Sequence, residues 1–136
     1  MSGKLLVAIV DDDASVRCSA GRLVRSIGYC AEEFGSAQEF LDSGRAASTA
    51  CLILDVRMPG IDGIELQRRL AGSDPAIPIV FITARASDVE ESRALQAGAV
   101  AFLRKPVAKD ALLHVLRGIL DKPTSAGGNP DDDSSR

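Results

Sequence analysis

The sequence predicts an α/β fold in which one parallel sheet is covered by helices on both faces. Five short apolar runs alternate with amphipathic helical patterns along the chain. Two of these runs are continuously apolar, which is typical of parallel strands that are buried on both faces. Consecutive strand–helix units predict right-handed crossovers within a single sheet. With 136 residues, 46% of them apolar, the chain is long enough to bury the core of one domain.

The first part of the chain predicts two strands, each followed by a helix. Leu5–Val10 is an apolar run and forms the first expected strand. Apolar residues then repeat at intervals of three and four over Val16–Ile27, which predicts an amphipathic helix that ends at Gly28. Tyr29–Phe34 is the second expected strand. Ser36–Glu39 matches a capping box and is expected to open the second helix.

The middle of the chain predicts two fully buried strands with a short helix between them. Cys51–Leu54 reads CLIL and Ile79–Thr83 reads IVFIT, without a charged residue in either run. Ile64–Leu70 predicts the third helix. Asp62 precedes Gly63 at its start, and we interpret this aspartate as a turn or cap residue.

The last part of the chain predicts one more strand between two helices. Ser87–Glu90 matches a second capping box, which is expected to open the fourth helix. Ala101–Leu103 is the fifth expected strand, and apolar spacing over Leu112–Leu120 predicts the fifth helix. The remaining residues are rich in Pro, Gly, Ser and Asp. We therefore expect one domain over residues 1–120 and a flexible linker or tail over residues 121–136.

Composition excludes several classes of function. The net charge of −3 equals the charge of residues 131–133 alone, and the core has no basic stripe of the kind that binds nucleic acid. No apolar stretch reaches the roughly 18 residues that a membrane helix needs. Cys18, Cys30 and Cys51 form no CxxC pair and are expected to be buried free thiols in a reducing, cytoplasmic compartment. His114 is the only histidine and is interpreted as a surface or partly packed residue.

Polar residues follow four of the five expected strands. These are Asp11, Asp12 and Asp13 after the first strand, Asp55 after the third, Thr83 ending the fourth and Lys105 after the fifth. The carboxyl ends of parallel strands meet at one edge of the sheet, so these side chains should converge there. Clustered carboxylates would repel a bare phosphate but suit Mg²⁺, which prefers oxygen ligands and keeps waters that a phosphate can replace. The site therefore suits a phosphoryl group held between a metal ion and Lys105, with Asp55 as its attachment point.

The segments VDDD, LILDVRMPGIDG, FITA and FLRKP occur in this order. The sequence resembles the receiver domain of bacterial two-component response regulators, and within that family the FixJ-like class. The resemblance covers roughly residues 4–120. It implies a flavodoxin-like three-layer fold whose five-stranded parallel sheet has the order 2-1-3-4-5.

The resemblance also implies a phosphoacceptor and a metal site. Asp55 would be the aspartate that accepts the phosphoryl group. Asp12 would bind Mg²⁺ together with Asp55, Asp11 would do so directly or through water, and the backbone carbonyl of Arg57 would supply another ligand. Asp13 is interpreted from its position as a helix cap or a solvated acid.

Two further roles follow from the resemblance. Thr83 would contact the phosphoryl oxygens through its hydroxyl group and Lys105 through its ammonium group, and the Lys105–Pro106 peptide bond would be cis. Phe102 would be the aromatic switch residue, moving inward when Thr83 moves toward the phosphoryl group. From the residues alone, Thr83 could simply end a strand and Phe102 could simply be a core residue.

The implied activity is that of a signalling domain that assists its own phosphorylation and slow dephosphorylation, without being an enzyme that turns over a substrate. The expected partner is a sensor histidine kinase. The resemblance also implies a homodimer through the fourth helix, fifth strand and fifth helix upon phosphorylation. The output is expected to be transcriptional, through an effector domain beyond residue 136. The alternative is a stand-alone phosphorelay or interaction module.

Three other functions compete with this interpretation. A phosphatase of the haloacid dehalogenase type also uses a strand-end aspartate with Mg²⁺, but it carries a second aspartate where this chain has Arg57. A degenerate receiver would lack Asp55, the acid pair or Lys105, and all are present. A flavodoxin-like cofactor domain would need a phosphate-binding loop, and aromatic residues at 4% offer little to stack on a flavin.

Two arginines flank the expected site. Arg57 lies two residues past Asp55, and Arg85 lies two residues past Thr83. Both are bulky and positively charged. Our hypothesis is that they crowd the attacking water and slow hydrolysis of the phosphoryl group.

Overall fold

The computed structural model describes residues 5–72 and 76–121 and contains one parallel sheet. The strands are β1 (Leu6–Val10), β2 (Cys30–Phe34), β3 (Thr49–Asp55), β4 (Ile79–Thr83) and β5 (Ala101–Arg104). They are parallel and lie in the order β2-β1-β3-β4-β5, which confirms the predicted flavodoxin-like topology. β3 begins two residues earlier than its apolar run because Thr49 pairs with Leu6 across an irregularity in the β1–β3 register.

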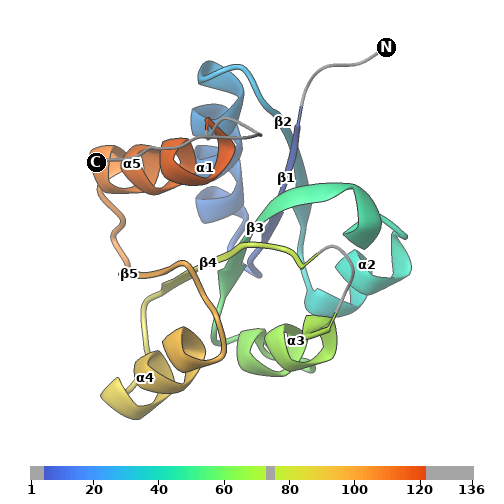
Figure 1. Cartoon of the computed structure of the whole chain (residues 1–136), viewed down its shortest axis with the longest axis vertical. Coiled ribbons are helices and arrows are strands. Elements are labelled where there is room, and N and C mark those ends of the chain that lie inside the picture. The colour runs from blue at the N-terminus through green and yellow to red at the C-terminus, as the bar shows by residue number, and fades with distance from the viewer. Residues whose placement is uncertain (1–4, 73–75, 122–136) are drawn as a thin grey trace, which may run out of the picture.

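The helices cover both faces of the sheet, as predicted. They are α1 (Ala14–Ser26), α2 (Ala37–Asp42), α3 (Gly63–Leu70), α4 (Asp88–Gln96) and α5 (Lys109–Leu120), with a 3₁₀ turn η1 (Ala46–Ser48) before β3. α1 and α5 lie on one face of the sheet, whereas α2, α3 and α4 lie on the other (Figure 1). Among the described residues, no helix is long and apolar enough to cross a bilayer.

Successive side chains along the central strands point to opposite faces of the sheet, which divides the core into two layers. Val7 and Ile9 of β1 face α1 and α5, while Ala8 and Val10 face the opposite layer. Leu116 of α5 is fully buried in the first layer. Burial of large side chains on both faces explains why β3 and β4 tolerate no charged residue before their carboxyl ends.

Two helix starts and one helix end follow the sequence signals. Ser87 and Glu90 form a complete capping box at the start of α4. Ser36 accepts a hydrogen bond from the Glu39 amide, but the Glu39 carboxylate accepts from the preceding Gly35 amide, so the second box is incomplete. Gly28 ends α1 with a φ of +95°, a conformation that favours glycine.

The prediction that all three cysteines are buried is wrong for two of them. Cys51 lies in β3 and is fully buried, but Cys18 and Cys30 are exposed. Cys18 lies on the outer side of α1. Cys30 begins β2, the edge strand of the sheet, which has a neighbouring strand on one side only. The predicted linker falls almost entirely on residues 122–136, which lie outside the described part of the chain.

Candidate phosphoacceptor and metal site

Strand register brings the acidic residues together at the carboxyl edge of the sheet. Val10 pairs with Leu54, so Asp11 and Asp55 leave β1 and β3 side by side. One carboxylate oxygen from each of Asp11, Asp12 and Asp55 lies within 4.8 Å of the others. Asp11 is fully buried and Asp55 is 4% exposed. Asp12 is exposed. The structure therefore brings together three of the four acids that the sequence predicts at this edge, without Asp13.

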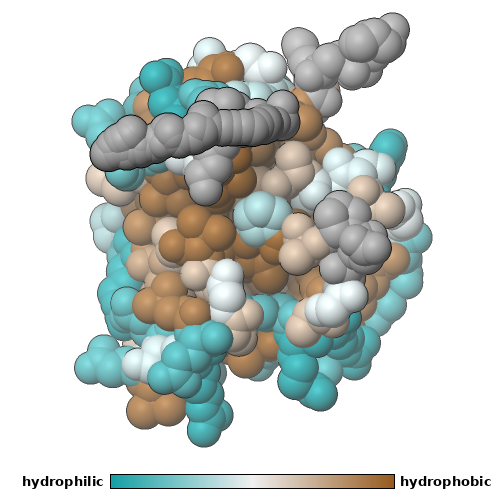
Figure 2. All heavy atoms as spheres, viewed as in Figure 1, coloured by the Kyte–Doolittle hydropathy of each residue, from teal (hydrophilic) through white to brown (hydrophobic). Residues whose placement is uncertain are grey.

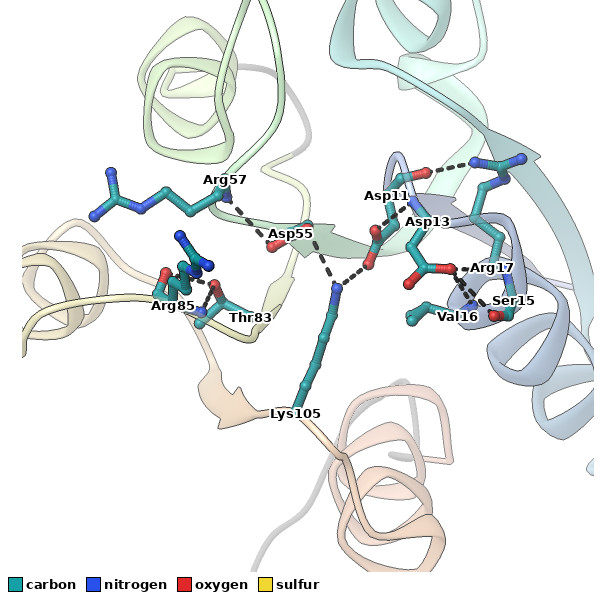
Figure 3. Close-up of polar contacts among 10 residues, drawn as sticks. All are labelled: Asp11, Asp13, Ser15, Val16, Arg17, Asp55, Arg57, Thr83, Arg85 and Lys105. Carbon is teal, nitrogen blue, oxygen red and sulfur yellow. Dashed lines mark hydrogen bonds and ion pairs between the residues drawn. The ribbon is translucent and has the colours of Figure 1, made fainter.

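Lys105 is the cation that faces these carboxylates (Figure 3). Its Nζ lies 2.8 Å from Oδ2 of Asp11 and 3.3 Å from Oδ2 of Asp55. The Lys105–Pro106 bond that precedes α5 is cis, as the resemblance implies. One ammonium group thus contacts two buried carboxylates, and a third carboxylate, that of Asp12, lies close to both, which leaves the site with an excess of negative charge.

The excess of negative charge shifts the pKa values of Asp55 and Lys105. Burial raises the pKa of Asp55, and the nearby charge of Asp11 raises it further, although Lys105 opposes both effects. Burial alone would lower the pKa of Lys105, but its contacts with Asp11 and Asp55 outweigh burial and raise it. The ionised form of Asp55 is therefore costly here without an additional positive charge.

The donor set fits a hard divalent cation. Oδ2 of Asp11 is buried and, within the described residues, accepts no hydrogen bond, because the Lys105 contact has ion-pair distance without hydrogen-bond geometry. Its partner there is the Lys105 ammonium, and a carboxylate oxygen in this position can also bind a metal ion. The carboxylates of Asp11, Asp12 and Asp55 are hard oxygen donors, which Mg²⁺ prefers. The Arg57 carbonyl as a further ligand stays a prediction.

The loop after β3 is held against the strand by Gly63. The Gly63 amide donates to the Val56 carbonyl at 2.9 Å, and a Cβ at position 63 would lie 2.2 Å from the carbonyl oxygen of Asp55. Only glycine fits this approach. Asp62 caps α3 through the Glu65 amide, as its turn-or-cap interpretation predicted. Our sequence interpretation assigned no role to Gly63; the aspartate–glycine pair at the helix start was the available signal.

A second set of contacts fixes Asp11. Its Oδ1 accepts a hydrogen bond from the Asp13 amide at 2.9 Å, and its carbonyl accepts one from Nη1 of Arg17 at 2.7 Å. Asp13 caps α1 by accepting from the amides of Ser15 and Val16, so the interpretation of Asp13 as a cap is confirmed. Arg17 was not predicted, because its partner is a backbone carbonyl that no sequence pattern marks.

Thr83 lies at the same edge, but its hydroxyl is engaged elsewhere. It is fully buried, donates to the Arg85 carbonyl at 2.8 Å and accepts from the Arg85 amide at 3.2 Å (Figure 3). Phe102 is half-buried with its ring centroid 5.7 Å from that of Phe81. His114 is exposed on α5 and is not part of the site.

Arg57 lies differently from our hypothesis. Its guanidinium group points away from Asp55 and pairs with Glu90 of α4 at 2.6 Å, while its amide donates to Oδ1 of Asp55 at 3.3 Å (Figure 3). In this arrangement the Arg57 side chain lies away from Asp55, and its proposed effect on hydrolysis stays a prediction. Arg85 is exposed at the rim of the site, and its proposed effect on hydrolysis stays a prediction.

The site thus combines a cluster of carboxylate oxygens that could bind a metal ion with the ammonium group of Lys105. Asp11 and Asp55 are both buried carboxylates of this cluster, and both contact Lys105. Such an arrangement can bind a phosphoryl group and place its phosphorus next to a nucleophilic oxygen.

Comparison with known proteins identifies the same architecture. Residues 7–117 match the response regulator receiver domain family. Nodulation protein W of Bradyrhizobium diazoefficiens is 45% identical over 115 residues, which cover 85% of this chain and 51% of that protein. The transcriptional regulatory protein FixJ of the same organism is 37% identical over 120 residues, 88% of this chain and 58% of that protein.

One solved structure matches this chain over nearly the whole of its own length and has the same fold. The response regulator receiver protein from Burkholderia phymatum is 44% identical, with a TM-score of 0.75 over 88% of this chain and 98% of that one. The chain spans about half the length of the curated relatives it matches.

Proposed function

The chain belongs to the response regulator receiver family, and we propose that it accepts a phosphoryl group on Asp55 from a partner histidine kinase. The observation that supports this most directly is the position of Asp55, which is buried at the carboxyl edge of the sheet with the Lys105 ammonium between it and Asp11 (Figure 3). FixJ, one of the two relatives above, is named a transcriptional regulatory protein. We extend that output to the protein that contains this domain, and place it in the cytoplasm with its kinase.

Mg²⁺ is the metal ion that fits the site. Asp11, Asp12, Asp55 and the carbonyl of Arg57 would hold it, with Asp11 acting directly or through water. When bound, it supplies positive charge to the phosphoryl oxygens in a site that otherwise has an excess of negative charge.

The transfer reaction needs only positioning and charge from this chain. An Asp55 oxygen attacks the phosphorus, a P–O bond forms, and the P–N bond to the kinase histidine breaks with its electron pair remaining on nitrogen. Lys105 lies close enough to neutralise charge on the phosphoryl oxygens as they leave the donor. No general base is required, because Asp55 attacks as the carboxylate.

A change at Thr83 would transmit the signal. The Thr83 hydroxyl, now bonded to Arg85, would turn to the phosphoryl oxygens on Asp55. Phe102 is half-buried beside Phe81 and would move into the space that Thr83 vacates. This is a two-state element that a local change in charge biases.

The test uses phosphoramidate, a small donor whose P–N bond resembles that of phosphohistidine. Incubation with Mg²⁺ should add the mass of one phosphoryl group to the intact protein, and EDTA should prevent it. If the mass is unchanged with Mg²⁺ present, or increases equally in EDTA, the proposed function is contradicted.

We also expect phosphorylation to produce a weak homodimer. Apolar surface is exposed over β5 between α4 and α5 (Figure 2). Leu95 in α4 and Val100 just before β5 are 42% and 50% exposed. Sedimentation should show a monomer without ligand and a partial dimer with Mg²⁺ and beryllofluoride. Val100→Arg should remove the dimer without weakening beryllofluoride binding. Protein that stays monomeric at every concentration with the ligand bound would contradict this expectation.

A further inference from the structure

Arg104, the last residue of β5, connects three parts of the molecule that must move relative to one another in the proposed switch. Nη1 donates to the carbonyl of Ala86 in the β4–α4 loop at 2.8 Å. Nη2 lies 2.8 Å from the carboxylate of Glu91 and 3.6 Å from that of Asp88, both in the first turns of α4. The guanidinium carbon also lies 5.6 Å from the centroid of the Phe102 ring.

α4 has few other attachments to the body of the domain. Ala94 is its only buried side chain. The Ala94 carbonyl accepts a hydrogen bond from the Gln67 amide group of α3 at 3.0 Å, and Arg57 reaches Glu90 from the β3–α3 loop. Figure 1 shows α4 at the periphery of the fold, beside β5. A helix that buries so little apolar surface depends on its polar contacts for its position.

The Arg104 contacts belong to the arrangement in which Thr83 is turned away from Asp55. The Thr83 hydroxyl is bonded to the carbonyl and amide of Arg85, one residue before Ala86. To bind a phosphoryl group on Asp55, that hydroxyl must give up both hydrogen bonds to Arg85. We expect the Arg85–Ala86 segment, released from these bonds, to shift and the Ala86 carbonyl to leave Arg104. Inward movement of Phe102 would take its ring away from the same guanidinium group.

We propose that Arg104 is a latch that stabilises the resting arrangement of the β4–α4 loop and the first turn of α4, and thereby opposes occupation of Asp55 by a phosphoryl group. The inference rests on the proposed function. A contact present only in the resting state lowers the population of the binding-competent state, and the apparent affinity falls by the same factor. Because the Arg104 side chain is 45% exposed, the expected factor is modest, about three- to tenfold.

The experiment compares the affinity of five forms of this chain for beryllofluoride, an analogue of the phosphoryl group, in saturating Mg²⁺. They are wild type, Arg104→Gln, Glu91→Gln, the double variant of these two substitutions, and Arg93→Gln. Arg93 is the matched control, since it is exposed on α4 and, among the described residues, forms no ion pair. Its substitution removes the same charge without touching the latch.

Arg104→Gln should bind beryllofluoride about three- to tenfold more tightly than wild type, with Mg²⁺ affinity changed by less than about twofold. Glu91→Gln should act in the same direction, and the double variant should gain less than the product of the two single effects. Amide hydrogen exchange in the first turn of α4 should be faster in Arg104→Gln without ligand. Arg93→Gln should match wild type in every measurement.

Weaker beryllofluoride binding by Arg104→Gln would overturn the latch, because it is the result expected if Arg104 merely attracts the anion. Equal binding would overturn it as well, because Arg104 would then have no effect on the resting state. An equal gain in Arg93→Gln would also overturn it, since the effect would then be one of net charge. If wild type and all variants fail to bind beryllofluoride, the proposed function fails first. The latch fails alone when wild type binds and Arg104→Gln shows no gain.

Discussion

Replacing Asp55 by Asn is expected to abolish phosphorylation by phosphoramidate and Mg²⁺, leaving the intact mass unchanged. The amide lacks the anionic oxygen that attacks phosphorus. Asp11 also belongs to the acid cluster and contacts Lys105, so retained labelling in this variant would point to Asp11. Asp62→Asn is the matched control, because Asn caps a helix about as well as Asp and Asp62 caps α3 away from the donor set. Equal labelling of Asp55→Asn and wild type would contradict the assignment.

The same substitution should make the metal-free protein more stable. A carboxyl group whose pKa is raised by folding stabilises the protein only at low pH, and that contribution is lost as the pH rises through the raised value. At pH 7 the ionised Asp55 is therefore a cost that the neutral amide removes. We expect a gain on the order of 1 kcal/mol in the free energy of unfolding, or roughly 4 °C in Tm. Saturating Mg²⁺ should reduce or reverse this difference, because it stabilises wild type preferentially.

Replacing Asp11 by Asn should weaken Mg²⁺ binding by about tenfold or more, which corresponds to roughly 1.4 kcal/mol. Asp11 is the fully buried member of the acid cluster, and its Oδ2 has no hydrogen bond within the described residues. Its loss removes a full negative charge from a site where little water can compensate. Isothermal titration with MgCl₂ measures the change directly.

Asp13→Asn is the control for this prediction. Asp13 lies two residues further along and is exposed, and its main contacts are the amide hydrogen bonds that cap α1. Asn can make the same cap, so both stability and Mg²⁺ affinity should stay near those of wild type. Comparable losses of affinity in both variants would indicate a general effect of charge, without a specific ligand at position 11.

Much of the fold could be predicted because the signals are local. The buried strands read as uninterrupted apolar runs, and the helix starts carry capping residues whose partners lie three positions away, as at Ser87 and Glu90. The site was also predictable in outline, since β–α alternation sends the residues after β1, β3 and β5 to one edge. Asp11, Asp55 and Lys105 meet there because each follows or ends a parallel strand at the same edge of the sheet.

What could not be predicted depends on contacts between residues far apart in sequence. The Arg57–Glu90 pair crosses 33 positions, and it reversed our expectation of where the Arg57 side chain points. The contact of Arg104 with Ala86 involves a backbone carbonyl, which every residue carries, so the sequence contains no residue type that predicts it. Cys18 was predicted to be buried from apolar neighbours in sequence, but exposure is decided by which side of α1 faces the sheet.

The central claim is that the phosphoryl group is carried by the carboxylate at position 55. After reaction with phosphoramidate and Mg²⁺, borohydride reduces an aspartyl phosphate to homoserine, which marks its position for peptide sequencing by mass spectrometry. Our account predicts homoserine at position 55 in wild type and none in Asp55→Asn. Homoserine at position 11 or 12, or a phosphoryl group found on a serine or on His114, would contradict it.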